Sequence, residues 1–436
     1  MSSVILCAAL AGCSLPAAKS KSQTALNLSW KWSGVIGTGQ SLSVGARAWP
    51  VISTNQPYDN LKLSTDHQPW PVGPNDTSLA LVPLVEPIGR LAPAYPSSWP
   101  ENINGETPHS AMANEITALV RADFDRDFVS VHSAVGEDGQ GMVFIRKNPV
   151  DRGLNGHSYE AAMIETKAIT RLAKAADKTY GVGAIIVTHG ETDAGNTNYE
   201  NELYQLWQDY NTDLPAITGQ TQKIQMIVSQ QDSRNDRSPS TLAQWKIGVD
   251  HPADIVCSGP KYQYPYFKDG VHLTADGYRQ LGEKYGQIYF ERVILGKDWQ
   301  PLEPTRVMRK GKIITIHFHV PAPPLVWETT FQPPHQSVDA WKQGGGFEIS
   351  TTARVKVTIS SAKISGDKVI ITCATDPGSD ARVSYAMIAD SAHAKMVMPY
   401  PGTFRWGRLR DSDPFEGANT KILQPNYCVA FEMTAP

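Results

Sequence analysis

The stretch KDGVHLTADGY, at residues 268–278, organises the interpretation of the whole chain. Asp269 and His272 lie three residues apart on a predicted turn, and the run from Thr274 opens a helical pattern that we expect to reach residue 295. A carboxylate can orient an imidazole and stabilise its charged form, and the imidazole can then take a proton from a nucleophile. This pair therefore predicts a nucleophilic serine or cysteine elsewhere in the chain.

The best candidate nucleophile is Ser41, in the sequence GTGQSLSVG at residues 37–45. A short apolar segment at 33–38 predicts a strand, and the glycines that follow predict a strand-to-helix turn. At a helix N-terminus, free backbone amides and the helix dipole can stabilise an oxyanion. Taken alone, Ser41 is better explained as a simple N-cap. Its interpretation as a nucleophile depends on the rest of the chain.

The segment from 28 to 297 predicts an α/β domain with a parallel sheet. After a loop-rich segment at 49–109, strand-like and helical patterns alternate. The predicted strands are 127–132, 183–188, 223–230 and 255–257, and the predicted helices are 110–121, 159–180, 201–214, 240–248 and 274–295. Ligands of such a domain bind beyond the carboxyl ends of the strands. Ser41, Gly136, His189 and the Asp269/His272 turn all follow predicted strands, so their placement is mutually consistent.

The pattern changes near residues 297–304. Alternating segments at 307–320, 354–359, 368–374, 383–388 and 427–433 predict short strands, and no helical pattern intervenes. We therefore expect an all-β, sandwich-like C-terminal module over residues 298–436.

Four short blocks together resemble the SGNH hydrolases: GQS at 39–41, Gly136, HGETD at 189–193 and DGVH at 269–272. The first and third blocks are most similar to those of the sialate O-acetylesterase-like carbohydrate esterases. The resemblance covers residues 35–296. It implies a three-layer α/β/α, flavodoxin-like domain, a Ser-His-Asp triad, and ester hydrolysis without a metal or other cofactor.

The resemblance assigns roles residue by residue. Ser41 matches the nucleophile, His272 the general base and Asp269 the residue that orients it. The backbone amides of Ser41 and Gly136 match two oxyanion donors.

The third oxyanion donor of the family is an asparagine or glutamine side chain, and here His189 stands in that position. An imidazole N–H can donate to an oxyanion, so the role is chemically accessible to His189. Glu191 and Asp193 are expected to support the loop through hydrogen bonds. A second Asp-x-x-His, at 390–393, lacks a preceding strand and a following long helix, and we interpret it as a coincidence.

Composition excludes some classes of partner. The 436 residues include 41% apolar and 19% charged residues, with a net charge of −3. No basic run is long enough to neutralise phosphates, so nucleic acid is not an expected partner. Gly-x-Ser-x-Gly and the common nucleotide and zinc motifs are absent.

The N-terminus has two interpretations. In MSSVILCAALAGCSLP, at residues 1–16, the LAGC tetrad resembles a bacterial lipoprotein cleavage box. Residues 1–27 would then be an export signal and tether with a lipid anchor at Cys13, giving a secreted, periplasmic or outer-surface protein. The alternative is a mildly apolar tail. In an exported protein Cys373 and Cys428 could pair; two buried free thiols are the other interpretation.

The sequence thus predicts a serine esterase that removes acetyl or other small acyl groups from a carbohydrate or a small ester. Two alternatives are open. One is a lipase-like or thioesterase enzyme of the same superfamily, and the other is a non-catalytic carbohydrate-binding or adhesion protein.

Overall fold

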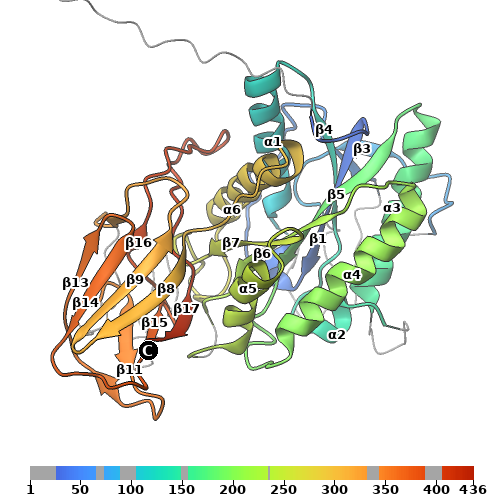
Figure 1. Ribbon diagram of the computed structural model, residues 1–436. Helices are drawn as coiled ribbons and strands as arrows, with labels where there is room; N and C mark the ends of the chain where they lie inside the picture. Colours follow the sequence, from blue (N-terminus) through green and yellow to red (C-terminus); the bar gives the residue numbers. More distant parts are fainter. Residues whose placement is uncertain are drawn as a thin grey trace, which may run out of the picture.

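The computed structural model describes residues 26–64, 73–88, 105–148, 156–233, 236–330, 343–387 and 405–436. It has an α/β part, which ends with a π-helical turn at Phe290–Ile294, and a C-terminal part of β-strands (Figure 1). The predicted lipid anchor at Cys13 and the second Asp-x-x-His at 390–393 lie outside the described residues. None of the helices in these ranges combines the length and the apolar character needed to cross a membrane.

A seven-stranded sheet forms the centre of the α/β part, in the order β3-β2-β4-β1-β5-β6-β7. The strands are β1 (Trp32–Gly39), β2 (Leu61–Leu63), β3 (Leu81–Pro83), β4 (Val129–Ala134), β5 (Tyr180–Thr188), β6 (Gln225–Gln230) and β7 (Ile255–Pro260). All neighbours are parallel except β2 and β3. The predicted parallel sheet is confirmed. The loop-rich segment at 49–109 also contributes two short strands that were not predicted, because β2 and β3 extend the sheet from within it.

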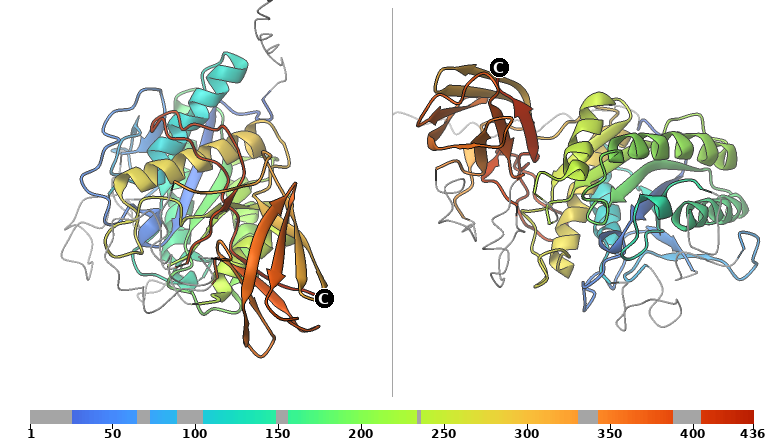
Figure 2. Two further views of the ribbon diagram at one scale, coloured as in Figure 1. Left: turned by 90° about the vertical axis from the view of Figure 1, so that its left-hand side faces the viewer. Right: turned by 90° about the horizontal axis from the view of Figure 1, so that it is seen from below.

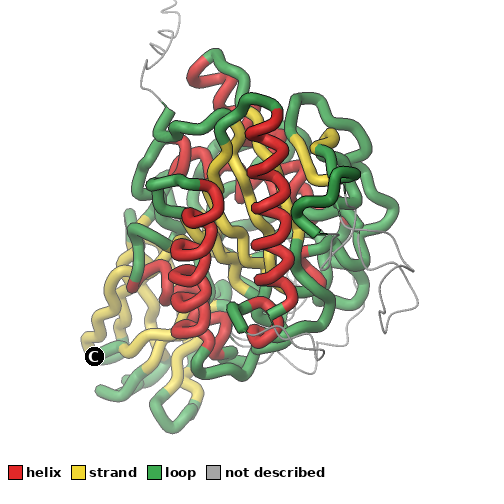
Figure 3. The backbone as a smooth tube through the Cα atoms, turned by 90° about the vertical axis from the view of Figure 1, so that its right-hand side faces the viewer, coloured by secondary structure: helices red, strands yellow, loops and turns green. Residues whose placement is uncertain are grey.

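Helices cover both faces of this sheet. One apolar core joins it to α3 (His157–Ala175), α4 (Tyr199–Thr218) and α5 (Pro239–Asp250). A second core, on the other face, joins it to α1 (Pro108–Phe124) and α6 (Ala275–Tyr289). Strands buried on both faces read as continuous apolar runs, and β5 is buried along its whole length. The helices therefore form the two outer layers around the strands (Figure 3).

One helix boundary was predicted wrongly. The pattern at 159–180 predicts a helix that stops before Gly181, but α3 ends at Ala175 and β5 already begins at Tyr180. The turn between them contains Asp177, whose φ of 55° is left-handed. Aspartate tolerates that conformation better than most residues, so Asp177 allows the sharp exit that the prediction assigned to glycine.

The central strand marks a switch in the direction of the chain. From β1 the chain runs to β2, β3 and β4 on one side of β1, and then crosses to β5, β6 and β7 on the other. Strand β1 therefore lies between β4 and β5, and loops leaving these three strands diverge at one edge. Open α/β sheets bind their ligands at such a point.

The C-terminal part holds two four-stranded antiparallel sheets, ordered β13-β14-β9-β8 and β12-β11-β15-β17 (Figure 2). Their strands are β8 (Glu303–Lys310), β9 (Ile313–His319), β11 (Phe347–Ser350), β12 (Lys356–Val357), β13 (Ile359–Ser365), β14 (Lys368–Cys373), β15 (Arg382–Tyr385) and β17 (Phe431–Thr434). A short antiparallel pair, β10 (Val326–Trp327) and β16 (Leu409–Arg410), forms a separate two-stranded sheet. The predicted all-β character of this part is confirmed. The strand expected at 354–359 is present only as the two-residue β12, and β13 at Ile359–Ser365 was not predicted.

Both C-terminal sheets share one apolar core, and that core continues into the α/β part. Trp245, Cys257 and Tyr262 belong to it together with residues of both sheets. This apolar cluster therefore contains residues from both sides of the domain boundary predicted at residue 297. Cys257, Cys373 and Cys428 are all buried free thiols, so no disulfide joins Cys373 to Cys428.

Candidate active site

Three side chains predicted to act together form one chain of hydrogen bonds. The Nε2 atom of His272 lies 2.8 Å from the Oγ atom of Ser41, although the two residues are 231 positions apart. On the other side of the ring, Nδ1 lies 2.7 Å from Oδ2 of Asp269. Because the carboxylate only accepts, Nδ1 carries the proton and Nε2 is left to accept from the Ser41 hydroxyl. This is the protonation state that a general base requires.

The local sequence explains the geometry of the Asp269–His272 turn. The second carboxylate oxygen of Asp269 accepts hydrogen bonds from the backbone amides of Val271 and His272, at 2.9 and 3.0 Å. Gly270 takes the left-handed conformation that closes the turn, with a φ of 68°. Thr274 then caps α6 by accepting from the amide of Gly277.

The charge of Asp269 is favoured by the same contacts. Burial alone would raise the pKa of this carboxyl, but its hydrogen bonds with His272 and the turn amides outweigh burial and hold the pKa below its ordinary value. Asp269 therefore remains ionised at any pH near neutrality, where it can orient the ring and stabilise an imidazolium.

Ser41 begins a short 3-10 turn, Ser41–Ser43, directly after β1, and only 4% of its surface is exposed. Gly39, the last residue of β1, has a φ of 139°, and a Cβ atom there would clash with the carbonyl oxygen of Thr188. The ends of β1 and β5 can approach this closely only because Gly39 has no side chain. The glycine predicted to shape this turn thus brings Ser41 next to the loop after β5.

Gly136 lies against the same turn. A Cβ atom at this position would clash with the Oγ atom of Ser43. The amide of Glu137 donates to the carbonyl of Gly39 at 3.1 Å, which ties the loop after β4 to the end of β1. Gly136 is therefore a close neighbour of the turn that holds Ser41. Its role as an oxyanion donor stays a prediction.

The arrangement of His189 does not suit the oxyanion role predicted for it. Its ring is fully buried, with Nδ1 2.7 Å from the hydroxyl of Tyr199 and Nε2 3.0 Å from the carbonyl oxygen of Gln140. The carbonyl can only accept, so Nε2 donates to it and Nδ1 accepts from Tyr199. Burial lowers the pKa of His189, which favours this neutral form. The ring's one N–H is therefore already engaged in holding the loop.

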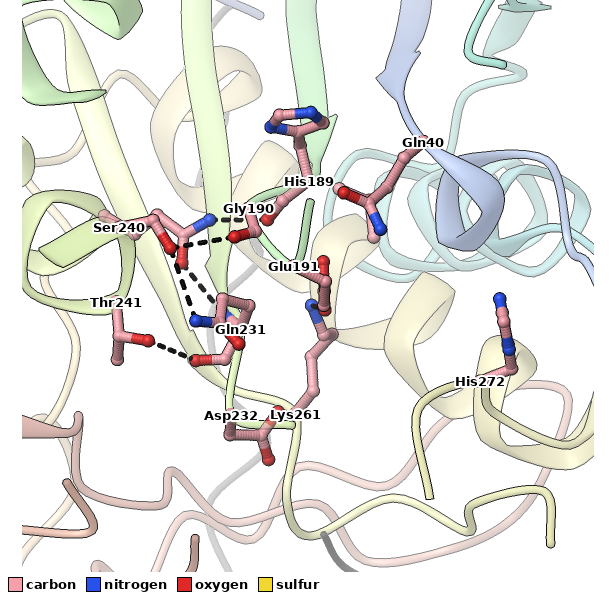
Figure 4. Close-up of polar contacts among 12 residues, drawn as sticks. Gln40, His189, Gly190, Glu191, Gln231, Asp232, Ser240, Thr241, Lys261 and His272 are labelled. Carbon is pink, nitrogen blue, oxygen red and sulfur yellow. Dashed lines mark hydrogen bonds and ion pairs between the residues drawn. The ribbon is translucent and has the colours of Figure 1, made fainter. Parts of the chain in front are cut away.

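The two carboxylates of the HGETD block also make contacts inside the protein. Glu191 forms a buried ion pair with Lys261, at 2.9 Å, and Figure 4 shows the two side chains meeting below His189. Burial favours the neutral acid, but the Lys261 ammonium reverses this and lowers the pKa of Glu191. Asp193 accepts from the backbone amide of Met142 at 2.6 Å. Both carboxylates thus connect separate loops at the edge of the sheet.

Sequence reasoning missed the partners of these residues. Lys261 follows β7, in a segment that showed only proline and tyrosine. Gln40 links two loops through its side-chain oxygen, which accepts from the amide of Thr192 at 3.1 Å. Arg405 reaches from the C-terminal part and donates to the carbonyls of Gln231 and Asp232, at 2.9 and 3.2 Å. The GQS motif contains Gln40, and the aromatic- and arginine-rich sequence around Trp406, which includes Arg405, is typical of a loop that packs one domain on the other.

A second buried carboxyl lies near Lys261 and Arg405. Asp232 follows β6, is fully buried, and accepts from the hydroxyl of Tyr266 at 2.9 Å. Burial raises its pKa to about 7, although the Lys261 and Arg405 charges act against that rise. Glu191, Lys261 and Asp232 therefore form a buried cluster of charged side chains in the loops after β5, β7 and β6 (Figure 4).

Comparisons with known proteins give a fold but no family. No protein-family model matches the chain, and no curated protein matches it by sequence. A crystal structure of a carbohydrate acetylesterase from Xanthomonas citri has a similar fold, with a TM-score of 0.55 at 14% identity, over 92% of this chain and 80% of that one.

Two further structures match smaller shares of the chain. A protein from Arabidopsis thaliana gives a TM-score of 0.44 at 17% identity, over 61% of this chain and all of its own. A carbohydrate acetylesterase from Sinorhizobium meliloti gives 0.31 at 14%, over 59% of this chain and 96% of its own. Because 92% of this chain is covered, the likeness to the Xanthomonas enzyme extends through both parts of the molecule, and it establishes a shared fold.

Proposed function

We propose that this protein is a serine esterase of the SGNH type that removes acetyl groups from carbohydrate. The observation that carries the proposal is the continuous hydrogen-bond chain from Ser41 through His272 to Asp269. These residues come from two distant segments, and they meet at the edge of the sheet where the direction of the chain switches. A nucleophile, a base and an orienting carboxylate in this order are the requirement for acyl transfer.

In the first half of the reaction, the Ser41 Oγ atom attacks the acetyl carbonyl carbon while its proton passes to His272 Nε2. The backbone amides of Ser41 and Gly136 stabilise the oxyanion of the tetrahedral intermediate. The intermediate collapses, the bond to the sugar oxygen breaks, and His272 returns the proton to that oxygen. The sugar hydroxyl leaves, and acetate remains esterified to Ser41.

In the second half, water takes the place of the sugar. His272 accepts a proton from the water as it attacks the acetyl-enzyme carbonyl, and then protonates the Ser41 oxygen as acetate leaves. Asp269 stays ionised throughout and stabilises the imidazolium in both halves. His189 takes no part in this proposal, because its N–H is bonded to Gln140.

Carbohydrate is proposed as the substrate because the Xanthomonas enzyme, described as a carbohydrate acetylesterase, shares the fold through the C-terminal sheets as well as the α/β part. Lipase-like and thioesterase activities are the alternatives within the same chemistry. They are separated by acyl preference: a carbohydrate acetylesterase should prefer acetyl esters to octanoyl esters and to acetyl thioesters.

The test is hydrolysis by wild type and by Ser41→Ala, with 4-nitrophenyl acetate and acetylated xylan as substrates. Loss of the nucleophile should reduce kcat by roughly 10⁴-fold or more. Ser78→Ala is the matched control, because Ser78 is an exposed serine whose hydroxyl donates to Asp76, two residues away. Equal rates in wild type and Ser41→Ala would remove Ser41 as the nucleophile. Inactivity of the wild type on every ester would favour the non-catalytic carbohydrate-binding alternative.

A further inference from the structure

Arg405 belongs to the C-terminal part, but its guanidinium group bonds to the α/β part. The residue is buried, with 1% of its surface exposed. It donates to the carbonyls of Gln231 and Asp232, and also to the hydroxyl of Thr241 on α5 at 2.9 Å. We propose that Arg405 is a positioning residue for His272, so that the C-terminal part helps to assemble the candidate active site. The inference rests on the proposed function for the role of His272.

The guanidinium group fixes the loop after β6. Its planar fork carries donors at fixed angles, and it uses them on two successive carbonyls of that loop and on α5. The Thr241 hydroxyl in turn donates to the carbonyl of Gln231 at 2.7 Å, which is one of the dashed lines in Figure 4. Hydrogen bonds from a charged donor are stronger than neutral ones. The loop that carries Asp232 is therefore held by both α5 and the C-terminal part.

Asp232 connects this loop to a tyrosine in the loop after β7. Its Oδ1 atom accepts from the hydroxyl of Tyr266 at 2.9 Å, and both residues are buried. Tyr266 also forms an antiparallel β-bridge with Leu273, the neighbour of His272. The next residue, Phe267, donates its amide proton to the carbonyl of His272 at 2.7 Å. His272 thus lies on a short antiparallel pair of segments, and the Tyr266 hydroxyl anchors the other segment of that pair.

The position of His272 relative to Ser41 needs such an anchor. The hydrogen bonds of Asp269 orient the imidazole within its own turn, but they do not set the distance from that turn to the nucleophile. The separation of 2.8 Å between Nε2 and Oγ joins residues 231 positions apart, so it depends on contacts that tie the turn to the rest of the fold. A misplacement of about 1 Å can lower a rate about 10²-fold. Loss of the Tyr266 or Arg405 contacts should therefore reduce kcat.

Two conservative variants test the two ends of this chain of contacts. Tyr266→Phe removes only a hydroxyl, and Arg405→Lys keeps the charge but loses the planar fork. Each should lower kcat on 4-nitrophenyl acetate about tenfold and leave KM nearly unchanged, because the groups that contact the substrate are still present. In the double variant the loss should be smaller than the product of the two single losses, because both contacts act through the same loop at Asp232.

Amide hydrogen exchange gives a readout that does not depend on turnover. The Phe267 amide bonds to the His272 carbonyl, so its exchange rate reports on opening of the turn. Relative to the amides of β5, at the centre of the sheet, it should exchange about tenfold faster in both variants than in wild type. A general loss of stability would not raise the exchange of Phe267 selectively.

Tyr262→Phe is the matched control for Tyr266→Phe. Tyr262 is a buried tyrosine of the same loop, but its hydroxyl donates to the carbonyl of Cys428 in the C-terminal part, at 2.7 Å. Both variants lose one buried hydrogen bond of similar length, so both should lose similar stability. Only Tyr266→Phe should lose activity.

Arg410→Lys is the control for Arg405→Lys. Arg410 is a partly buried arginine that donates to Glu328 at 2.7 Å and to the carbonyl of Asp411 at 2.9 Å, both within the C-terminal part. It should keep wild-type kcat and wild-type exchange of the Phe267 amide.

Wild-type rates of hydrolysis and of Phe267 exchange in Tyr266→Phe and Arg405→Lys would overturn the inference, and so would losses that the two control variants share. If Arg405→Lys does not fold, Tyr266→Phe and its control still make the comparison. If the wild type hydrolyses no ester, the proposed function fails. The exchange of the Phe267 amide would then still show whether these contacts hold the turn of His272, so the two proposals fail separately.

Discussion

The sheet edge that carries Ser41 differs in construction from the interface between the α/β part and the C-terminal part. At the sheet edge, the orienting pair is local: Asp269 and His272 are three residues apart and share one turn. The interface is made by residues that are distant in sequence. Gln230 exchanges two hydrogen bonds of 2.8 Å with the backbone of Ala430, 200 positions away. Glu283 accepts from Gln424, 141 positions away.

The two regions differ because the sheet edge must supply particular chemical groups, whereas the interface must only pack well. The reaction demands particular residue types in a particular order, so the sheet edge leaves short motifs in the sequence. The interface demands only that buried polar groups find partners and that apolar surfaces fit. Many residue types satisfy that demand, so the interface leaves no motif. We expect substitutions at the sheet edge to change catalytic rate and substitutions at the interface to change stability.

The largest effect is expected for Asp269→Asn, at the sheet edge. An asparagine cannot stabilise the imidazolium, and its amide can donate to Nδ1 and select the wrong tautomer of His272. We expect kcat on 4-nitrophenyl acetate to fall by about 10³- to 10⁴-fold. The melting temperature should change little, because the turn keeps an oxygen that can accept from the amides of Val271 and His272.

Asp276→Asn is the control for this change. Asp276 lies in the first turn of α6, and 68% of its side chain is exposed. It should keep wild-type kcat. A comparable loss of activity in both variants would show that the effect comes from general damage to the start of α6, and the role proposed for Asp269 would fall.

The next effect is on stability. Lys261→Met removes the cation from the buried Glu191–Lys261 pair and leaves the Glu191 carboxylate without its ion-pair partner, beside Asp232. Breaking such a pair costs about 3–5 kcal/mol in the free energy of unfolding. The double variant Glu191→Gln/Lys261→Met leaves no buried charge at these two positions and should recover a large part of the loss. Urea unfolding of the three proteins measures both values.

A double variant no more stable than Lys261→Met would contradict this account. It would show that the pair acts through specific contacts of the loops and not through its charge. Hydrolysis rates would add a second comparison, because Glu191 anchors the loop that follows β5 next to Ser41.

Sequence analysis found the sheet edge because its residues follow predicted strands in a fixed order. The Ser41, Asp269 and His272 positions needed no knowledge of distant contacts. His189 was misjudged because its partners are Tyr199, at the start of α4, and Gln140, in the loop after β4, and no motif links either of them to it. Lys261 and Arg405 were missed for the same reason. The sequence does not indicate that a lysine or arginine is buried unless the residue it contacts in the folded protein is known.

The fold divides in the same way. Periodic apolar patterns identified the five long helices and the longer parallel strands. They did not identify β2 and β3, which are only three residues long, or the four-residue helix α2 (Met142–Ile145). The continuous apolar core that joins Trp245 and Tyr262 to the C-terminal sheets was also not predicted. The segments around these two residues were assigned to the α/β domain, and nothing in their sequence indicates contact with another part of the molecule.

The smallest effect concerns the interface, and it depends on pH. Glu303, at the start of β8, accepts from the indole N–H of Trp245 on α5 at 2.8 Å. Burial raises the pKa of Glu303 to about 7, although this hydrogen bond acts against the rise. Between pH 4.5 and 7 the folded protein keeps a proton that the unfolded chain has released. The contribution of Glu303 to stability is therefore complete below pH 4.5 and is lost as pH rises to 7.

Glu303→Gln mimics the protonated acid at every pH and keeps an oxygen for Trp245. It should match wild type near pH 4.5 and be more stable by roughly 3 kcal/mol or less at pH 7.5, since each unit of pKa shift corresponds to about 1.4 kcal/mol. Other buried acids titrate in this window, so the quantity to measure is the difference between the two proteins in urea unfolding at each pH. Glu416→Gln, at an exposed position of the C-terminal part, should show no such divergence. If the difference in unfolding free energy between Glu303→Gln and wild type is the same at every pH, the Glu303 carboxyl is ionised over the whole range. Trp245 and the surrounding polar groups would then stabilise its charge more than burial opposes it.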